Sequence, residues 1–167
     1  MPHAGRGEVC IEVHFAGINF ADTLMRLGLY QPRPPFPFTP GYEVSGIIHS
    51  LGEGVTEFEV GQRVVAASQT GGQASHIVAQ ISRVIPLPDE MSLEKAAAMP
   101  VTYMTAHHML HHLGNLKPTD TVLIHGGAGG SRHRGTPTMS MGRCKQGLGD
   151  GIGAQGRYYQ TIFGYSD

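Results

Sequence analysis

The sequence predicts a β-rich α/β protein organised around a small, curled β-structure. Residues 40–65 alternate short β-branched runs with five glycines, a pattern typical of strands that turn sharply or lie against neighbouring backbones. Glycine is frequent along the whole chain, at 24 of 167 residues, and charged residues make up only 15%, against about 25% in typical domains. An apolar, β-branched run at residues 121–125 leads directly into a glycine run, which indicates that a second domain begins there.

Composition excludes several classes of function. The formal net charge of -1 provides no global field that would attract nucleic acid or an anionic membrane surface. The two cysteines, Cys10 and Cys144, cannot form a disulfide framework or a four-thiolate zinc site. Residues 1–8 lack the apolar core of a signal peptide, and no run approaches the roughly 18 apolar residues of a membrane span. We therefore predict a cytoplasmic protein with no transmembrane segment and no nucleic-acid partner.

The first 40 residues predict a strand, a short helix and an ordered loop. Residues 8–15 alternate in polarity, which predicts a half-buried strand. Its inward side is predicted to be Val9, Ile11, Val13 and Phe15. Residues 19–27 predict a helix that Asn19 or Asp22 caps. Its apolar face is predicted to be Phe20, Leu24 and Leu27. Five prolines in residues 28–40 predict a loop, because proline fixes the backbone and removes a hydrogen-bond donor.

The middle of the chain predicts three further strands, two helices and one last strand. The strands are expected at residues 62–67, 74–79 and 83–87. A helix is expected to begin at Ser92, and a longer one to cover residues 101–113 after Pro100 and to end at Gly114. Residues 121–125 are then expected to form a strand that is apolar enough for a parallel sheet.

A break in composition follows Gly130. Residues 131–167 hold five basic and two acidic residues, a net charge of +3, so the first 130 residues carry -4. Neither a 3.6-residue nor a 2-residue period holds beyond a few positions, and we expect residues 131–167 to be a divergent, disordered tail. The strand at 121–125 would then lack a later strand to pair with, and its exposed edge predicts homo-oligomerisation or low solubility.

Several ordered motifs give the sequence a resemblance to a known family. They are residues 16–22, 28–30, 40–65, 96–106 and 122–126. With these motifs, residues 5–130 resemble the zinc-independent quinone oxidoreductase branch of the medium-chain dehydrogenase/reductase superfamily. Within that branch they look most like the synaptic-vesicle amine-transport membrane protein homologues. The resemblance implies a GroES-like β-barrel catalytic domain at residues 1–100, its first strand missing, and only the first strand and turn of a Rossmann domain at residues 101–130.

The resemblance also implies a reaction and a site. Such proteins pass hydride from NADPH to a small-molecule quinone or activated alkene (enone), and an association with vesicle or mitochondrial membranes is implied as well. The implied catalytic residues are Asn19 and Tyr30. The implied cofactor-binding residues are Asn19, Thr105, Gly126, Gly129 and Gly130. The residues by themselves leave other interpretations open: Asn19 as a helix N-cap, Tyr30 as loop packing and Thr105 as a helix-surface residue.

Two features depart from the family pattern. Zinc-dependent relatives have Gly-His-Glu where this chain has Gly41-Tyr42-Glu43, and tyrosine is not a usual zinc ligand, so we expect no metal. After Gly130, residues 131–135 replace the third glycine and the apolar helix that a dinucleotide fingerprint needs. We therefore expect NADPH binding to be lost in this chain. The alternative to a reductase is a catalytically dead fragment or interaction module that retains the GroES-like fold.

Four histidines form a separate motif. His107 and His111 are one i, i+4 pair, and His108 and His112 are another. This spacing can place two imidazoles on one metal ion. No glutamate or cysteine completes a site, and a pH-sensitive or merely amphipathic helix face is the other interpretation.

Overall fold

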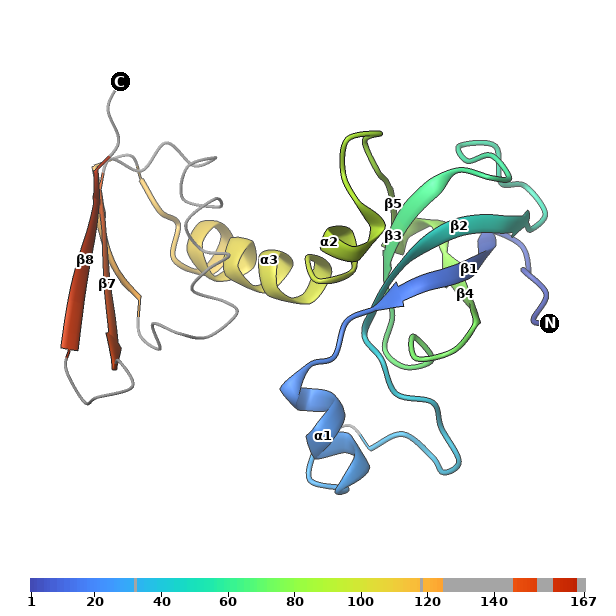
Figure 1. The fold of residues 1–167 in the computed structure, drawn as a ribbon, viewed down its shortest axis with the longest axis horizontal. Helices are drawn as coiled ribbons and strands as arrows, with labels where there is room; N and C mark the ends of the chain where they lie inside the picture. Colours follow the sequence, from blue (N-terminus) through green and yellow to red (C-terminus); the bar gives the residue numbers. More distant parts are fainter. Residues whose placement is uncertain (32, 118, 125–145, 153–157, 165–167) are drawn as a thin grey trace. The chain divides into compact units, whose positions relative to one another are not determined.

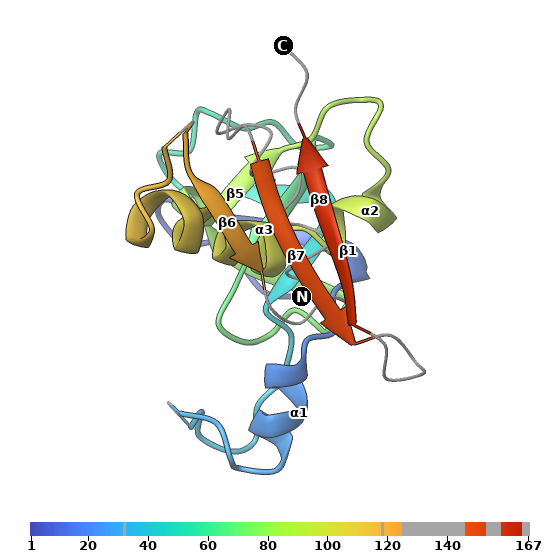
Figure 2. The ribbon, with the colours of Figure 1, turned by 90° about the vertical axis from the view of Figure 1, so that its left-hand side faces the viewer.

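The structure is a computed structural model that describes residues 1–31, 33–117, 119–124, 146–152 and 158–164. The chain divides into two compact units, Met1–Val101 and Thr102–Asp167. Figure 1 labels most helices and strands of both units, and β6 is labelled in Figure 2. The candidate site lies in the first unit.

The first unit is built on a curled, five-stranded antiparallel sheet with the strand order β4-β1-β2-β3-β5 (Figure 1). The strands are β1 (Glu8–Ala16), β2 (Glu43–Leu51), β3 (Arg63–Ala67), β4 (His76–Gln80) and β5 (Val84–Pro86). β1, β3, β4 and β5 were predicted within a few residues, and β2 lies inside the stretch at residues 40–65, for which no strand bounds were predicted. The sheet confirms the curled β-structure expected around residues 40–65.

The core of this unit lies inside the curl of the sheet. Its most deeply buried members include Val9, Ile11, Val44, Ile48 and Val64. β2 runs between β1 and β3, and Gly46 lets the backbones approach, because a Cβ at this position would lie 1.9 Å from the carbonyl oxygen of Glu12. The glycines of the central stretch thus serve close packing at Gly46 and turns with positive φ at Gly54 and Gly61.

The predicted inward side of β1 is correct at its start and wrong at its end. Val9 and Ile11 are fully buried, whereas Phe15 is 44% exposed. The pairing of β1 with β2 shifts register between Val13 and Phe15. Because an irregularity of this kind interrupts the alternation of side chains, a strict two-residue period does not carry through to Phe15.

The helix α1 (Phe20–Arg26) forms where predicted but buries a different face. Phe20 and Leu27 are 76% and 66% exposed, whereas Asp22 and Met25 are buried. The expected apolar face is therefore wrong, whereas Asp22 does lie in the first turn, where it was expected. The Asp22 carboxylate accepts a hydrogen bond from the Gly41 N–H, and this contact turns the polar face of α1 inward.

One short helical segment lies between the last two strands of the sheet, and a short helix and a longer helix follow the sheet. η1 (Ile81–Arg83) precedes β5, and α2 (Leu93–Ala97) begins after Ser92, whose hydroxyl oxygen accepts from the Lys95 N–H at 3.3 Å. α3 (Pro100–His107) begins at Pro100 and continues as the π-helix η2 (His108–Leu113). Gly114 caps it, as predicted. Among the helices that the structure describes, none has the length and apolarity to cross a membrane.

The second unit contains a three-stranded sheet, β6 (Thr121–Ile124), β7 (Gln146–Ile152) and β8 (Tyr158–Gly164) (Figure 2). β6 pairs with β7 in parallel and β7 pairs with β8 antiparallel. The expectation that the strand at 121–125 has no later partner is therefore wrong. Strands pair through backbone groups, so a strand can form without a two-residue period in its side chains. The glycine-rich sequence of β7 has no such period, and the strand was therefore not predicted. β7 and β8 lie within the segment for which the sequence predicted disorder; residues 125–145 lie outside the described residues.

Candidate active site

The site is organised by three consecutive residues at the entry to β2, Gly41-Tyr42-Glu43, here called the 41–43 segment. The Gly41 N–H donates to Asp22 Oδ1 at 2.9 Å. The Tyr42 ring meets the Tyr30 ring edge-on, with centroids 6.3 Å apart. Glu43 Oε1 accepts from Asn19 Nδ2 at 2.8 Å. One short segment thus holds the start of α1 and the loop that follows it.

Asn19 occupies the N-cap position of α1. Its N–H donates to Asp22 Oδ2 at 2.8 Å, and the Asp22 N–H donates to the Asn19 carbonyl oxygen at 3.0 Å. Because the Glu43 carboxylate accepts hydrogen bonds, the amide NH2 of Asn19 must face it, which assigns the orientation of the side chain. Asn19 therefore does occupy the helix N-cap position, the alternative that the sequence left open. Its side chain, however, is held by Glu43.

Glu43 is a buried carboxylate, 3% exposed, with both oxygens engaged. Oε1 binds Asn19, and Oε2 accepts from the Val101 N–H in the first turn of α3 at 2.8 Å. A negative charge is favourable at the start of a helix, and the two hydrogen bonds offset the cost of burial. Gly17 makes room for this group, since a Cβ there would lie 2.4 Å from Oε1.

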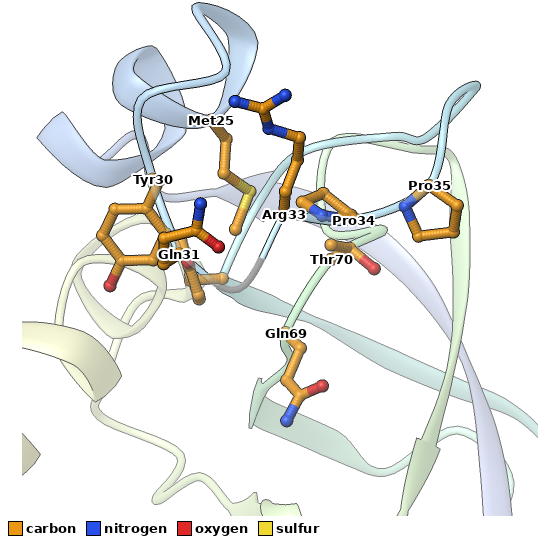
Figure 3. A pocket seen from close by; sticks show the side chains of 9 residues that line it. Met25, Tyr30, Gln31, Arg33, Pro34, Pro35, Gln69 and Thr70 are labelled. Atoms are coloured by element: carbon orange, nitrogen blue, oxygen red, sulfur yellow. The ribbon is translucent and has the colours of Figure 1, made fainter.

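A pocket of about 420 Å³ opens beside the two tyrosines (Figure 3). Its wall comes from α1, the proline-rich loop, the 41–43 segment and the loop after β3. The lining residues are Met25, Tyr30, Gln31, Arg33, Pro34, Pro35, Tyr42, Gln69 and Thr70. Arg33, which also donates to the carbonyl oxygen of Gly28, is the one charged residue among them. A mostly apolar pocket with a few polar groups suits a small, partly aromatic ligand.

The electrostatics of the pocket centre on Tyr42. Burial, followed by a hydrogen bond with Tyr30 and the negative charge of Asp22, raises the pKa of Tyr42 to about 12. Its hydroxyl therefore stays protonated and neutral throughout the physiological range. Around this tyrosine, as in the rest of the described residues, no group of three or more His, Cys, Asp or Glu side chains is arranged to hold a metal ion.

The structure brings some predicted site residues together and leaves others apart from the pocket. Asn19 and Tyr30 both contact the 41–43 segment; Tyr30 lines the pocket, and Asn19 is not one of its lining residues. Thr105 is an exposed residue of α3 in the second unit. The three predicted cofactor-binding glycines, Gly126, Gly129 and Gly130, lie outside the described residues.

Sequence reasoning missed three residues that shape the site. Tyr42 was considered only as a residue that replaces a zinc ligand, yet it contacts Tyr30. Met25 lies three residues after Asp22 and therefore on the same face of α1. This spacing was the signal that could have identified Met25 as buried. Gln69 comes from the loop after β3, and no local pattern marks it.

A curled antiparallel sheet with a short helix and a pocket at the entry to its second strand defines the class of the first unit as a GroES-like domain. The comparison with protein families agrees. The chain belongs to the alcohol dehydrogenase GroES-like domain family, whose sequence model matches residues 5–89.

Individual relatives show the same relationship. The synaptic vesicle membrane protein VAT-1 homolog of Danio rerio is 43% identical over 129 residues, which are 77% of this chain and 27% of that protein. The solved quinone oxidoreductase from Thermus thermophilus, studied also in complex with NADPH, superposes with a TM-score of 0.78 at 32% identity, covering 92% of this chain and 48% of that one. CurK enoyl reductase superposes with a TM-score of 0.81 at 30% identity, covering 89% and 47%. The chain thus spans about a quarter of the curated relative and about half of each solved chain.

Proposed function

We propose that this chain provides the substrate side of a zinc-independent reductase that transfers hydride from NADPH to a quinone or an enone. The observation that carries the proposal is the 41–43 segment, which contacts Asn19 through Glu43 and contacts Tyr30, a residue that lines the pocket, through Tyr42. The names of the solved relatives, a quinone oxidoreductase with NADPH and an enoyl reductase, support the reaction class.

The residues of the first unit fit the nicotinamide end of the cofactor. NADPH, when bound, supplies the hydride. Glu43 turns the amide NH2 of Asn19 toward itself, so the side chain presents its carbonyl oxygen as the acceptor for a donor such as a carboxamide. Asn19 would thereby orient the nicotinamide, and Thr105 and the glycines of residues 126–130 would bind other parts of the cofactor.

The pocket suits the acceptor of the hydride. Met25 and Pro34 offer apolar surface to a planar ring, and the phenols of Tyr30 and Tyr42 offer hydrogen bonds. Reduction of a quinone or enone builds negative charge on the substrate oxygen, and a donor aimed at that oxygen stabilises the transition state. Because the pKa of Tyr42 is raised to about 12, its hydroxyl keeps its proton for the hydrogen bond with Tyr30, which leaves the Tyr30 hydroxyl proton for the substrate oxygen.

The surroundings of Glu43 support a reaction without zinc. In the zinc-dependent pattern the corresponding Gly-His-Glu segment contributes to the metal site. Here Tyr42 stands where the histidine would be. The two oxygens of Glu43 accept hydrogen bonds from the Asn19 side-chain amide and the Val101 N–H. The segment therefore acts as a structural support for α1 and α3.

The second candidate is a non-catalytic module that retains the GroES-like fold. It is favoured by residues 131–135, Ser-Arg-His-Arg-Gly, which replace the glycine and apolar helix of a dinucleotide fingerprint. On either account we propose a small-molecule ligand and a cytoplasmic protein. The name of the vesicle membrane relative supports peripheral vesicle association, and homo-oligomerisation remains a proposal.

Titration of the whole chain with NADPH, and separately with menadione as a quinone probe, tests both candidates. The reductase predicts saturable binding of both, and oxidation of NADPH by menadione that Asn19→Ala lowers at least tenfold. Tyr30→Ala should weaken menadione binding, whereas Tyr103→Phe, on α3 outside the pocket, should not. If menadione binds and NADPH does not, the non-catalytic module is correct. If neither binds, the pocket assignment is wrong.

A further inference from the structure

Four histidines at the end of α3 and in η2 are not used by the proposed function. The ring centroids of His107 and His111 lie 4.7 Å apart, those of His107 and His112 6.0 Å, and those of His108 and His112 5.3 Å. His111 is half-buried and the other three side chains are exposed. We call these four residues the imidazole cluster.

The π-helix explains why the four rings form one cluster. In a regular α-helix, the i, i+4 spacing would give two separate pairs. In η2 a hydrogen bond spans five residues, from the Gly114 N–H to the Met109 carbonyl oxygen at 2.8 Å. A residue at i+5 then comes over residue i, which adds the contact of His107 with His112. His107 and His112 therefore each meet two other rings of the cluster.

The chemistry of the cluster favours a transition metal. Residues 96–116 contain no Asp, Glu, Lys or Arg, so neither a carboxylate ligand nor a repelling cation lies on this helix. Imidazole nitrogen suits zinc, copper and nickel, whereas magnesium and calcium prefer oxygen. Among the described residues, no group of three or more His, Cys, Asp or Glu side chains is arranged to hold a metal ion. A metal site on this helix would therefore have two protein ligands.

The distance between His107 and His111 fits a chelate. With metal–nitrogen bonds of about 2.0–2.1 Å and bond angles between square and tetrahedral, two imidazoles on one ion have ring centroids roughly 4.5–5.2 Å apart. His107 and His111 lie within this range, at 4.7 Å and tilted by 46°. The rings of His108 and His112 are farther apart, at 5.3 Å, and are stacked at 26°, so His107 and His111 are the pair whose separation fits the chelate better.

We propose that His107 and His111 chelate one divalent transition-metal ion, such as Zn²⁺, with water in the remaining coordination positions. The site lies within one helix and does not depend on cofactor or substrate binding. Both ligands belong to this chain. If no metal binds at His107 and His111, the proposed reductase function is unaffected.

The test is a calorimetric titration of the 167-residue chain with Zn²⁺ at neutral pH. We expect one ion per chain above the background of a variant with all four histidines replaced by alanine. His107→Ala and His111→Ala should each weaken binding at least tenfold. His108→Ala is the matched control, an adjacent exposed histidine, and should change the affinity less than twofold.

Alanine keeps the experiment interpretable, because it has the highest helix propensity and does not weaken the helix that carries the site. Circular dichroism should show unchanged helix content in every variant. Both cysteines are present in all of them, so thiol binding cancels in the comparison. Equal binding by the wild type and the four-alanine variant would overturn the proposal, as would a loss in His108→Ala as large as that in His107→Ala.

Discussion

Two buried carboxylates, Asp22 and Glu43, hold the candidate site together. The Asp22 oxygens accept from the N–H groups of Asn19 and Gly41. The Glu43 oxygens accept from the Asn19 side chain and from the Val101 N–H. Each oxygen thus has one donor, which is the condition under which a buried carboxylate is tolerated. The positions of Asn19 and α1 therefore depend on individual carboxylate oxygens, each of which accepts one hydrogen bond.

Replacing one oxygen of Glu43 should destabilise the first unit. In Glu43→Gln an NH2 group faces a donor, either the Asn19 amide or the Val101 N–H, so one buried hydrogen bond is lost. We expect a loss of about 1–3 kcal/mol in the free energy of unfolding, measured by urea denaturation. The exposed Glu53→Gln is the control and should change stability by less than about 0.5 kcal/mol. Equal effects of the two variants would contradict the role of Glu43.

Tyr42 should ionise at a higher pH than an unperturbed tyrosine. Because its folded-state pKa is raised to about 12 from the model-peptide value of 10.0, the native state holds this proton more tightly than the unfolded chain. The contribution of Tyr42 to stability is therefore constant at neutral pH and decreases as the pH rises from about 10 to about 12. Tyrosinate absorbance should show a late-titrating phenol that is missing in Tyr42→Phe. An unchanged titration in that variant would refute the assignment.

At the scale of elements, backbone approach in the sheet depends on Gly46. It lies in β2 opposite Val13 of β1 and Val64 of β3, and the space above it is filled by the Glu12 carbonyl oxygen. No rotation of a flexible side chain can relieve a contact with backbone. The central strand therefore depends on the absence of a Cβ.

Gly46→Ala should disrupt the sheet more than Gly54→Ala does. An alanine Cβ at residue 46 would lie 1.9 Å from the Glu12 oxygen, whereas the space around Gly54 is open and its cost is limited to the positive φ of 78°, about 1–2 kcal/mol. We expect Gly54→Ala to fold with this loss and Gly46→Ala to lose more or to remain unfolded in circular dichroism. A Gly46→Ala variant as stable as Gly54→Ala would contradict the packing described here.

The elements show where local patterns lead to correct predictions. The ends of α2 and α3 were predictable because Ser92, Pro100 and Gly114 act on the backbone next to them. The buried face of α1 was not, because Asp22 turns inward toward Gly41, a residue distant in sequence. Phe15 was misplaced because a register shift depends on the pairing of two strands, which one strand's period does not reveal.

At the scale of the whole chain, the two units have different relations to the proposed function. The first unit contains the pocket, both carboxylates and the predicted catalytic residues Asn19 and Tyr30. The second unit contains Thr105, the imidazole cluster and the sheet β6-β7-β8. The binding of NADPH by the whole chain is therefore the property that separates a reductase from a module that retains the GroES-like fold.

The sequence by itself determined the family, four strands of the curled sheet within a few residues, and the starts of α2 and α3; Asn19 and Tyr30 as site residues remain predictions. These depend on interactions between near neighbours or on motifs that stay in order along the chain. The tertiary structure alone decided that residues 41–43 hold both site residues, that Asp22 is buried and that β6 has a partner. These features depend on hydrogen bonds and strand pairing between distant residues, and such contacts leave no period in the sequence.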